Sequence, residues 1–178
     1  MKKPLLIFLL IVLVNSSFSQ SKVTIDKFFK WQYDSITKKP FILDLEKLFD
    51  TSQTKILNTL ISNFEKESTL EICIVTFDTN FKTEDELQEN TLYLAKYSKI
   101  GKKNKNNGIL IGLSKKSRKI RIENGIGIKK ILTDAETKKI IDDFFIPNFK
   151  NENYYLGTSN GLNKLIEVLS KRLNNNNQ

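Results

Sequence analysis

The carboxylates best placed to do chemistry in this sequence are Asp44, Asp78 and Asp134. Asp78 directly follows an apolar run that is typical of a buried strand, and ligands of open sheets collect at that end of the strands. Three carboxylates at one sheet edge would repel one another unless a divalent cation or a lysine lay among them. We therefore expect these three side chains to be the ligands if the protein binds a metal ion.

Asp134 and Asp78 also have structural interpretations. An aspartate in the first turn of a helix, as Asp134 is expected to be, interacts favourably with the helix dipole. An aspartate after a strand, such as Asp78, commonly bonds its own backbone two residues further on. Asp78-Thr79-Asn80 resembles the beginning of an EF-hand loop, but Lys82 occupies the fifth position and Thr83 stands where that loop requires glycine. The sequence therefore excludes an EF-hand.

The sequence contains no histidine and one cysteine, Cys73. These absences exclude nucleophile–histidine pairs, thiolate zinc sites and intrachain disulfides. A bound metal would be held by oxygen atoms, which favours calcium, magnesium or manganese over zinc or copper, and the candidate cofactors are Ca²⁺ and Mg²⁺. No phosphate-binding Gly-Lys-Ser loop is present, and phosphate-ester hydrolysis would depend on a metal ion at the three aspartates. Cys73 lies in an apolar run and is expected to be an inert part of the core.

The chain has 178 residues, of which 29 are lysine or arginine and 20 are aspartate or glutamate, giving a net charge of +9. This length supports one hydrophobic core. Because the lysines are scattered among acidic residues, nucleic acid is not an expected partner. The densest basic cluster, Lys102-Lys103-Asn104-Lys105, reads as a solvated loop, with contact to anionic lipid or an acidic partner as the alternative.

The first residues have the pattern of a secretory signal peptide. Two lysines precede the apolar run Leu5–Val14, and small residues follow it. This run is shorter than the roughly 20 residues that span a bilayer. We expect a signal peptide over 1–19 and export to the periplasm or the outside. After it we expect an N-terminal arm over 20–40, one domain over 41–173 and a disordered polar tail over 174–178. We expect no transmembrane anchor in the mature chain.

Capping residues and apolar side chains at helical spacing predict four helices. Asp50 with Gln53 and Thr83 with Glu86 begin the first two, and Thr133 with Glu136 begins the third. The expected ranges are 51–67, 84 to Gly101, 134 to Pro147, which cannot continue a helix, and 157–173. The inward side chains expected in the second helix are Leu87, Leu94 and Tyr97.

Three strands are predicted over 70–77, 108–113 and 119–123. The first two are near-continuous apolar runs, which is typical of strands covered on both faces. A helix separates them, so we expect a right-handed parallel crossover. A short polar turn over 114–117 predicts a hairpin between the last two strands. The expected fold is an α/β three-layer αβα sandwich with a small mixed β-sheet between helices.

From Phe41 to about Leu169, the order of these segments resembles the TPM domain family, named for thylakoid, plant and worm membrane-associated members. The segments that carry the resemblance are a strand-like start with Asp44, a helix with Leu57 and Leu60, Ile74-Val75-Thr76, Ile100-Gly101, Asn107-Gly108-Ile109-Leu110-Ile111, Arg118-Lys119-Ile120-Arg121-Ile122, Gly125-Ile126-Gly127-Ile128, Leu132-Thr133-Asp134, Ile146-Pro147-Asn148-Phe149 and Tyr154-Tyr155-Leu156-Gly157. The resemblance implies a helix–sheet–helix sandwich on an exported protein. It also implies assistance to membrane complexes, acid phosphatase activity in some members and divalent-cation binding in loops at one sheet edge.

Two positions depart from the family pattern. Asn106 stands where the family often has an acidic residue, and Lys129 stands where it often has glutamate. Asparagine keeps an oxygen donor without the charge, and lysine repels a cation. We therefore expect any cation site in these loops to be weakened or lost.

The resulting expectation is an exported, non-catalytic binding or accessory module for a protein or membrane-associated complex, modulated by divalent cations. Tyr154 and Tyr155, expected to be exposed beside Gly157, support an interface, while packing beneath the last helix is the alternative. The alternative function is a metal-dependent, acid phosphatase-like hydrolase that uses clustered carboxylates.

Overall fold

Four strands form one mixed sheet in the computed structural model, which describes residues 41–101 and 105–176. The elements of this part are β1 (Ile42–Asp44), α2 (Thr51–Ser68), β2 (Glu71–Thr76), α3 (Glu84–Tyr97), β3 (Gly108–Ser114), β4 (Lys119–Asn124), α4 (Ile126–Lys129), α5 (Asp134–Ile140), the π-helical turn η1 (Ile141–Phe145), α6 (Ile146–Lys150) and α7 (Tyr154–Asn176). The expected signal peptide, N-terminal arm and most of the lysine cluster lie outside the described residues. None of the described helices is both long and apolar enough to span a membrane.

The sheet has the order β1-β2-β3-β4, with β1, β2 and β3 parallel and β4 antiparallel to β3. Ile111 of β3 lies between Ile74 of β2 and Ile122 of β4. The predicted crossover through α3 and the predicted hairpin are confirmed. The strand-like start with Asp44 is a full fourth strand, β1, which pairs with the end of β2.

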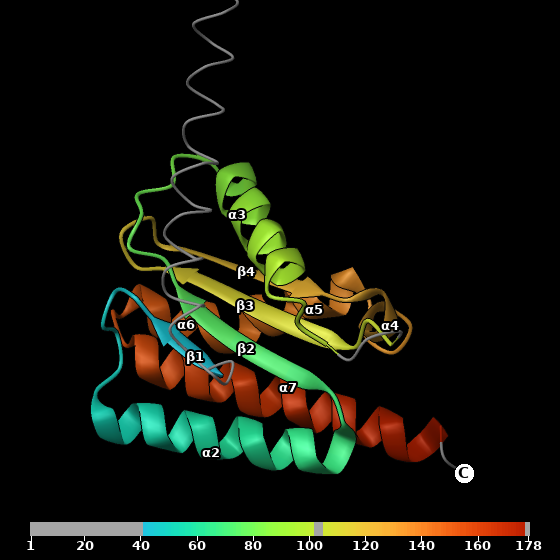
Figure 1. The fold of residues 1–178 in the computed structure, drawn as a ribbon. Coiled ribbons are helices and arrows are strands. Elements are labelled where there is room, and N and C mark those ends of the chain that lie inside the picture. Colours follow the sequence, from blue (N-terminus) through green and yellow to red (C-terminus); the bar gives the residue numbers. More distant parts are fainter. Residues whose placement is uncertain (1–40, 102–104, 177–178) are drawn as a thin grey trace, which may run out of the picture. The chain divides into compact units, whose positions relative to one another are not determined.

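Helices cover both faces of the sheet, so the predicted three-layer arrangement is confirmed (Figure 1). The α3 helix lies on one face, over β3 and β4, where Leu87 and Leu94 are buried. The α2 and α7 helices lie on the other face, where a single apolar core joins them to the sheet. Burying this apolar surface is the main favourable contribution to folding.

The local signals that predicted the helix beginnings are found in the structure. The Asp50 side chain accepts a hydrogen bond from the Gln53 N–H, and the Gln53 side chain accepts one from the Asp50 N–H. Thr133 and Glu136 form the same reciprocal pair at α5. These contacts satisfy backbone donors that the first helical turn leaves without partners.

Three expectations about helices were wrong. The third helix does not end at Pro147, because Pro147 lies in the first turn of α6, where a missing N–H is tolerated, and η1 joins α5 to α6. The α7 helix begins at Tyr154 and runs to Asn176, into the expected polar tail. Tyr97 is not an inward side chain, because it is 38% exposed and stacks on Tyr93, with 6.1 Å between ring centroids.

Candidate functional site

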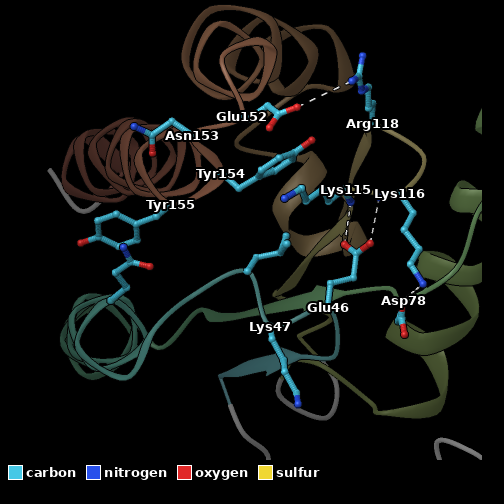
Figure 2. A pocket seen from close by; sticks show the side chains of 12 residues that line it. Glu46, Lys47, Asp78, Lys115, Lys116, Arg118, Glu152, Asn153, Tyr154 and Tyr155 are labelled. Atoms are coloured by element: carbon cyan, nitrogen blue, oxygen red, sulfur yellow. Dashed lines mark hydrogen bonds and ion pairs between the residues drawn. The ribbon is translucent and has the colours of Figure 1, made fainter.

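A hollow of about 700 Å³ lies where the loops after β1 and β2 meet the β3–β4 turn and the start of α7 (Figure 2). We call it the Glu46 hollow. Its lining residues are Glu46, Lys47, Leu48, Gln53, Asp78, Lys115, Lys116, Arg118, Glu152, Asn153, Tyr154 and Tyr155. The parallel pairing of β1 and β2 brings their carboxyl ends together at one edge of the sheet, the edge formed by the strand ends and not by an outer strand. The β3–β4 turn lies at the same edge. This is the edge at which ligands of open α/β sheets bind.

Glu46 is held at the centre of this edge by backbone amides. Its carboxylate accepts hydrogen bonds from the Lys115 N–H at 2.7 Å and the Lys116 N–H at 3.0 Å (Figure 2). Its own N–H donates to Thr76 Oγ1 at 2.9 Å. Partial burial raises the pKa of Glu46, although the two amide donors oppose that effect. Glu46 therefore ties the loop after β1 to the β3–β4 turn.

The β3–β4 turn brings three cationic side chains to the hollow. Lys116 forms an ion pair with Asp78, and both side chains are more than half exposed. Arg118 lies 4.0 Å from Glu152 in a second exposed pair. Lys115 Nζ lies 5.7 Å from the centroid of the Tyr154 ring and has no carboxylate partner in the described part of the chain. These loosely held cations can bind an anionic group.

The backbone around the hollow adopts uncommon conformations. The φ values of Lys47, Arg118 and Glu152 are 54°, 53° and 59°. These values lie in the left-handed region, which residues other than glycine rarely adopt. Each such residue costs on the order of 1–3 kcal/mol, and strain of this kind is concentrated at functional sites. The hollow is therefore built from loops that the surrounding contacts hold in place.

The two tyrosines pack on their neighbours. Tyr154 is only 8% exposed and stacks on Phe149, with 4.9 Å between ring centroids. Burial raises the pKa of Tyr154. Tyr155 is partly buried against the core. Of the two alternatives for this pair, packing describes the rings better than exposure, because Tyr154 stacks on Phe149 and Tyr155 is partly buried. Both still line the hollow.

The three aspartates singled out from the sequence do not converge. Asp44 ends β1, where its carboxylate accepts hydrogen bonds from the Leu48 N–H at 3.0 Å, the Phe49 N–H at 2.9 Å and Thr76 Oγ1 at 2.6 Å. Asp78 lines the hollow, whereas Asp134 begins α5. Because β4 runs antiparallel, the chain that leads to Asp134 departs from the opposite sheet edge.

In residues 41–101 and 105–176, no group of three or more His, Cys, Asp or Glu side chains is arranged to hold a metal ion. The expectation of one shared site was therefore wrong. Binding of a cation by any one of the three aspartates stays a prediction.

The loops that depart from the family pattern meet at this opposite sheet edge. Lys129 Nζ donates to Asp134 Oδ2 at 2.9 Å. The Asn106 carbonyl accepts a hydrogen bond from the Gly127 N–H at 3.0 Å. A side chain at Gly125 would overlap the Asn106 carbonyl oxygen, so glycine is required there for close packing of the two loops. The Lys129–Asp134 pair therefore lies in the loops where we expected a cation site to be weakened or lost.

Comparison with known proteins places this arrangement in a family. The sequence model of the TPM domain matches residues 42–168, which include the whole sheet. The chain belongs to the TPM domain family. Among proteins with curated descriptions, none matches the sequence.

Solved structures of bacterial proteins share the fold of this TPM domain. The N-terminal domain of a P. gingivalis protein is 29% identical, with a TM-score of 0.69 over 76% of this chain and 85% of that one. The BA42 protein from Bizionia argentinensis is 20% identical, with a TM-score of 0.62 over 72% and 86%. The N-terminal domain of a Corynebacterium glutamicum protein is 12% identical, with a TM-score of 0.50 over 80% and 82%. All three are NMR structures.

Sequence reasoning missed most of the hollow of this TPM domain. It singled out Asp78, Tyr154 and Tyr155 but assigned no role to Glu46, Lys115, Lys116 or Arg118. The available signal was the run of basic residues in the predicted hairpin turn, which the parallel crossover places at the same edge as Asp78. Glu46 gave no comparable signal, because only its contact with the turn, about seventy residues away in sequence, makes it central.

Proposed function

We propose that this TPM domain is an exported, non-catalytic binding module whose Glu46 hollow holds an acidic segment of a partner protein, either free or part of a membrane-associated complex. The observation that carries the proposal is the gathering of Lys115, Lys116 and Arg118 beside Tyr154 in one hollow. Cationic groups attract an acidic segment, and a tyrosine ring supplies apolar contact area with little loss of side-chain freedom. The leader-like pattern of residues 1–19 supports export.

The charges of the hollow favour binding of an anion. Glu46, the most central carboxylate of the hollow, already accepts hydrogen bonds from two backbone amides, which satisfy much of its negative charge. The ion pairs of Asp78 and Glu152 are exposed, and pairs of this kind contribute about 0–1 kcal/mol. An incoming carboxylate can therefore replace Asp78 or Glu152 as the partner of Lys116 or Arg118 at small cost.

The test is calorimetric titration of the purified protein with a short polyglutamate peptide. Binding is expected, and it should weaken steeply as the salt concentration rises. The double variant Lys115→Gln/Arg118→Gln should bind roughly twofold to thirtyfold more weakly, since each exposed charge pair contributes about 0.2–1 kcal/mol and two are lost. The control Lys130→Gln/Lys171→Gln removes the same charge from exposed positions outside the hollow and should leave the affinity unchanged.

Two results would contradict this proposal. Equal weakening in both double variants would show that net charge, and not the hollow, determines binding. Binding to vesicles of anionic lipid with no binding of the peptide would make a membrane surface the ligand.

Modulation by divalent cations is the second part of the proposal. Asp78 is exposed and lies beside Lys116, so a cation that binds Asp78 would release this lysine for the acidic partner. Calorimetry with calcium tests this step. If calcium produces no heat and no rise in melting temperature, this part of the proposal is wrong.

A phosphatase-like hydrolase is the second candidate function, and one feature favours it. Asp78 lies in the same hollow as Lys116 and Arg118, so a phosphate ester bound there would meet both a carboxylate and cations. Purified protein should be assayed against model phosphomonoesters with and without magnesium, manganese and calcium. Metal-dependent turnover that disappears in Asp78→Asn would replace the binding proposal with this one.

A further inference from the structure

The β4 strand ends the sheet, and half of its backbone groups point away from β3. The Gly125 N–H donates to the Gly108 carbonyl at 2.9 Å, which shows that these two residues form a hydrogen-bonded pair. Such pairs alternate along an antiparallel ladder, so Lys119, Arg121 and Glu123 bond to β3. The N–H and C=O groups of Ile120 and Ile122 therefore face outward, and no strand of the described part of the chain pairs with them.

This open edge lies at the bottom of a second hollow, of about 680 Å³, which we call the β4 hollow. Glu84 and Gln88 of α3 border it on one side, and Ala135 and Lys138 of α5 border it on the other. The helices on both sides leave the edge recessed. Unpaired sheet edges are sites for pairing with an extended segment of another chain.

The two sides of the β4 hollow differ chemically. Lys119 and Arg121 project toward the α3 side, where Lys119 lies 3.6 Å from Glu84, and Arg121 donates to Glu123 at 2.7 Å. On the other side, Ile141 of η1 and Ile146 of α6 are partly buried apolar side chains that line the hollow. The exposed side chains of Asp134, Lys138 and Asp142 also line this side. Because side chains alternate along a strand, a segment paired with β4 would present every second residue to the cations and the others to the isoleucines.

We propose that the β4 edge binds an extended segment of a partner protein as an additional strand, with acidic residues alternating with apolar ones. The outward groups of Ile120 and Ile122 supply backbone hydrogen bonds, and the two sides of the hollow select the alternating side chains. A second copy of the chain is a poorer occupant, because each copy carries a net charge of +9 and its own helices flank its β4.

The test is NMR of the purified protein with a short synthetic peptide in which glutamate and valine alternate. Amide exchange at Ile120 and Ile122 should slow by at least about tenfold in the complex, because these N–H groups gain partners. The Arg121 amide already bonds to β3 and should change little, which makes it an internal reference. A permuted peptide, with all its glutamates at one end, should not protect Ile120 or Ile122.

Variants separate this site from the Glu46 hollow. Lys119→Gln/Arg121→Gln should weaken binding of the alternating peptide by roughly twofold to tenfold, on the scale of cross-strand charge pairs. Lys115→Gln/Lys116→Gln changes two side chains that line the Glu46 hollow but not the β4 hollow, whereas Arg118 lines both. This variant should therefore leave the protection of Ile120 and Ile122 in place. Equal protection by both peptides, or spectral changes confined to the Glu46 hollow, would overturn the proposal. Protection of Ile120 that rises with protein concentration in the absence of peptide would show self-pairing and would also overturn it.

Discussion

Replacement of Asp44 should destabilise the protein more than replacement of any other candidate aspartate. The Asp44 carboxylate accepts hydrogen bonds from two backbone amides and from the hydroxyl of Thr76, which is completely buried. A hydrogen bond to a charged acceptor contributes about 1.5–3 kcal/mol, and the partial exposure of Asp44 places these three bonds at or below the low end. Asp44→Ala should therefore lower the free energy of unfolding by about 2–4 kcal/mol.

Two further variants calibrate this value. Asp44→Asn keeps one acceptor oxygen but turns an amide donor toward a backbone donor, so it should cost about 1–3 kcal/mol. Asp78→Ala removes only an exposed pair with Lys116 and should cost about 0–1 kcal/mol. Urea unfolding followed by circular dichroism measures all three variants, since the slope shows whether the transition is unchanged.

A metal-binding role for Asp44 would give a different result. If Asp44→Ala unfolds like the unmodified protein in the absence of calcium, but loses a stabilisation that calcium confers on that protein, the structural interpretation is refuted. A loss of about 2–4 kcal/mol without any metal present would instead show that Asp44 holds the loop after β1 in place, beside the Glu46 hollow.

Two other predictions concern α7. Gly161→Ala would place a methyl group against the ring of Phe145, which is completely buried. This overlap should outweigh the gain of about 1 kcal/mol in helix propensity, so the melting temperature should fall. The control Asn160→Ala, at an exposed position of the same helix, should be neutral or stabilising. Hydrogen bonds from Arg172, at 2.5 and 3.0 Å, and then from the Thr133 N–H and hydroxyl lower the pKa of Glu136 to about 2. These contacts stabilise the fold fully above pH 4.5 and progressively less as the pH falls toward 2. Arg172→Gln should lower the urea midpoint at pH 6 and flatten its fall between pH 5 and pH 3, and a fall as steep as that of the unmodified protein would contradict this assignment.

Much of the layer architecture could be predicted because its signals are local. Asp50 with Gln53 and Thr133 with Glu136 act within one helical turn, so their types and spacing are sufficient to place the beginnings of α2 and α5. The near-continuous apolar runs of β2 and β3 indicate strands covered on both faces, and an intervening helix implies a parallel crossover.

The errors and the point left open have a common physical cause. Pro147 ends a helix according to local rules, yet η1 shifts the backbone so that Pro147 falls in the first turn of α6. Exposure and packing were both open for Tyr154, which stacks on Phe149, a contact made only when α6 and α7 pack together. The three aspartates were expected at one edge, but the antiparallel β4 carries the chain to the other edge before Asp134.

The amino-acid sequence by itself determined the beginnings of α2, α3 and α5, the order of the strands along the chain and the absence of histidine and thiolate-pair chemistry. Only the tertiary structure decided which polar side chains meet. Glu46 reaches the Lys115–Lys116 amides, and Asp44 reaches Thr76, across separations that no local pattern encodes. Local signals depend on the bonds within one turn or one strand. The Glu46 hollow instead depends on loops that approach one another only when the strands have paired in the correct register.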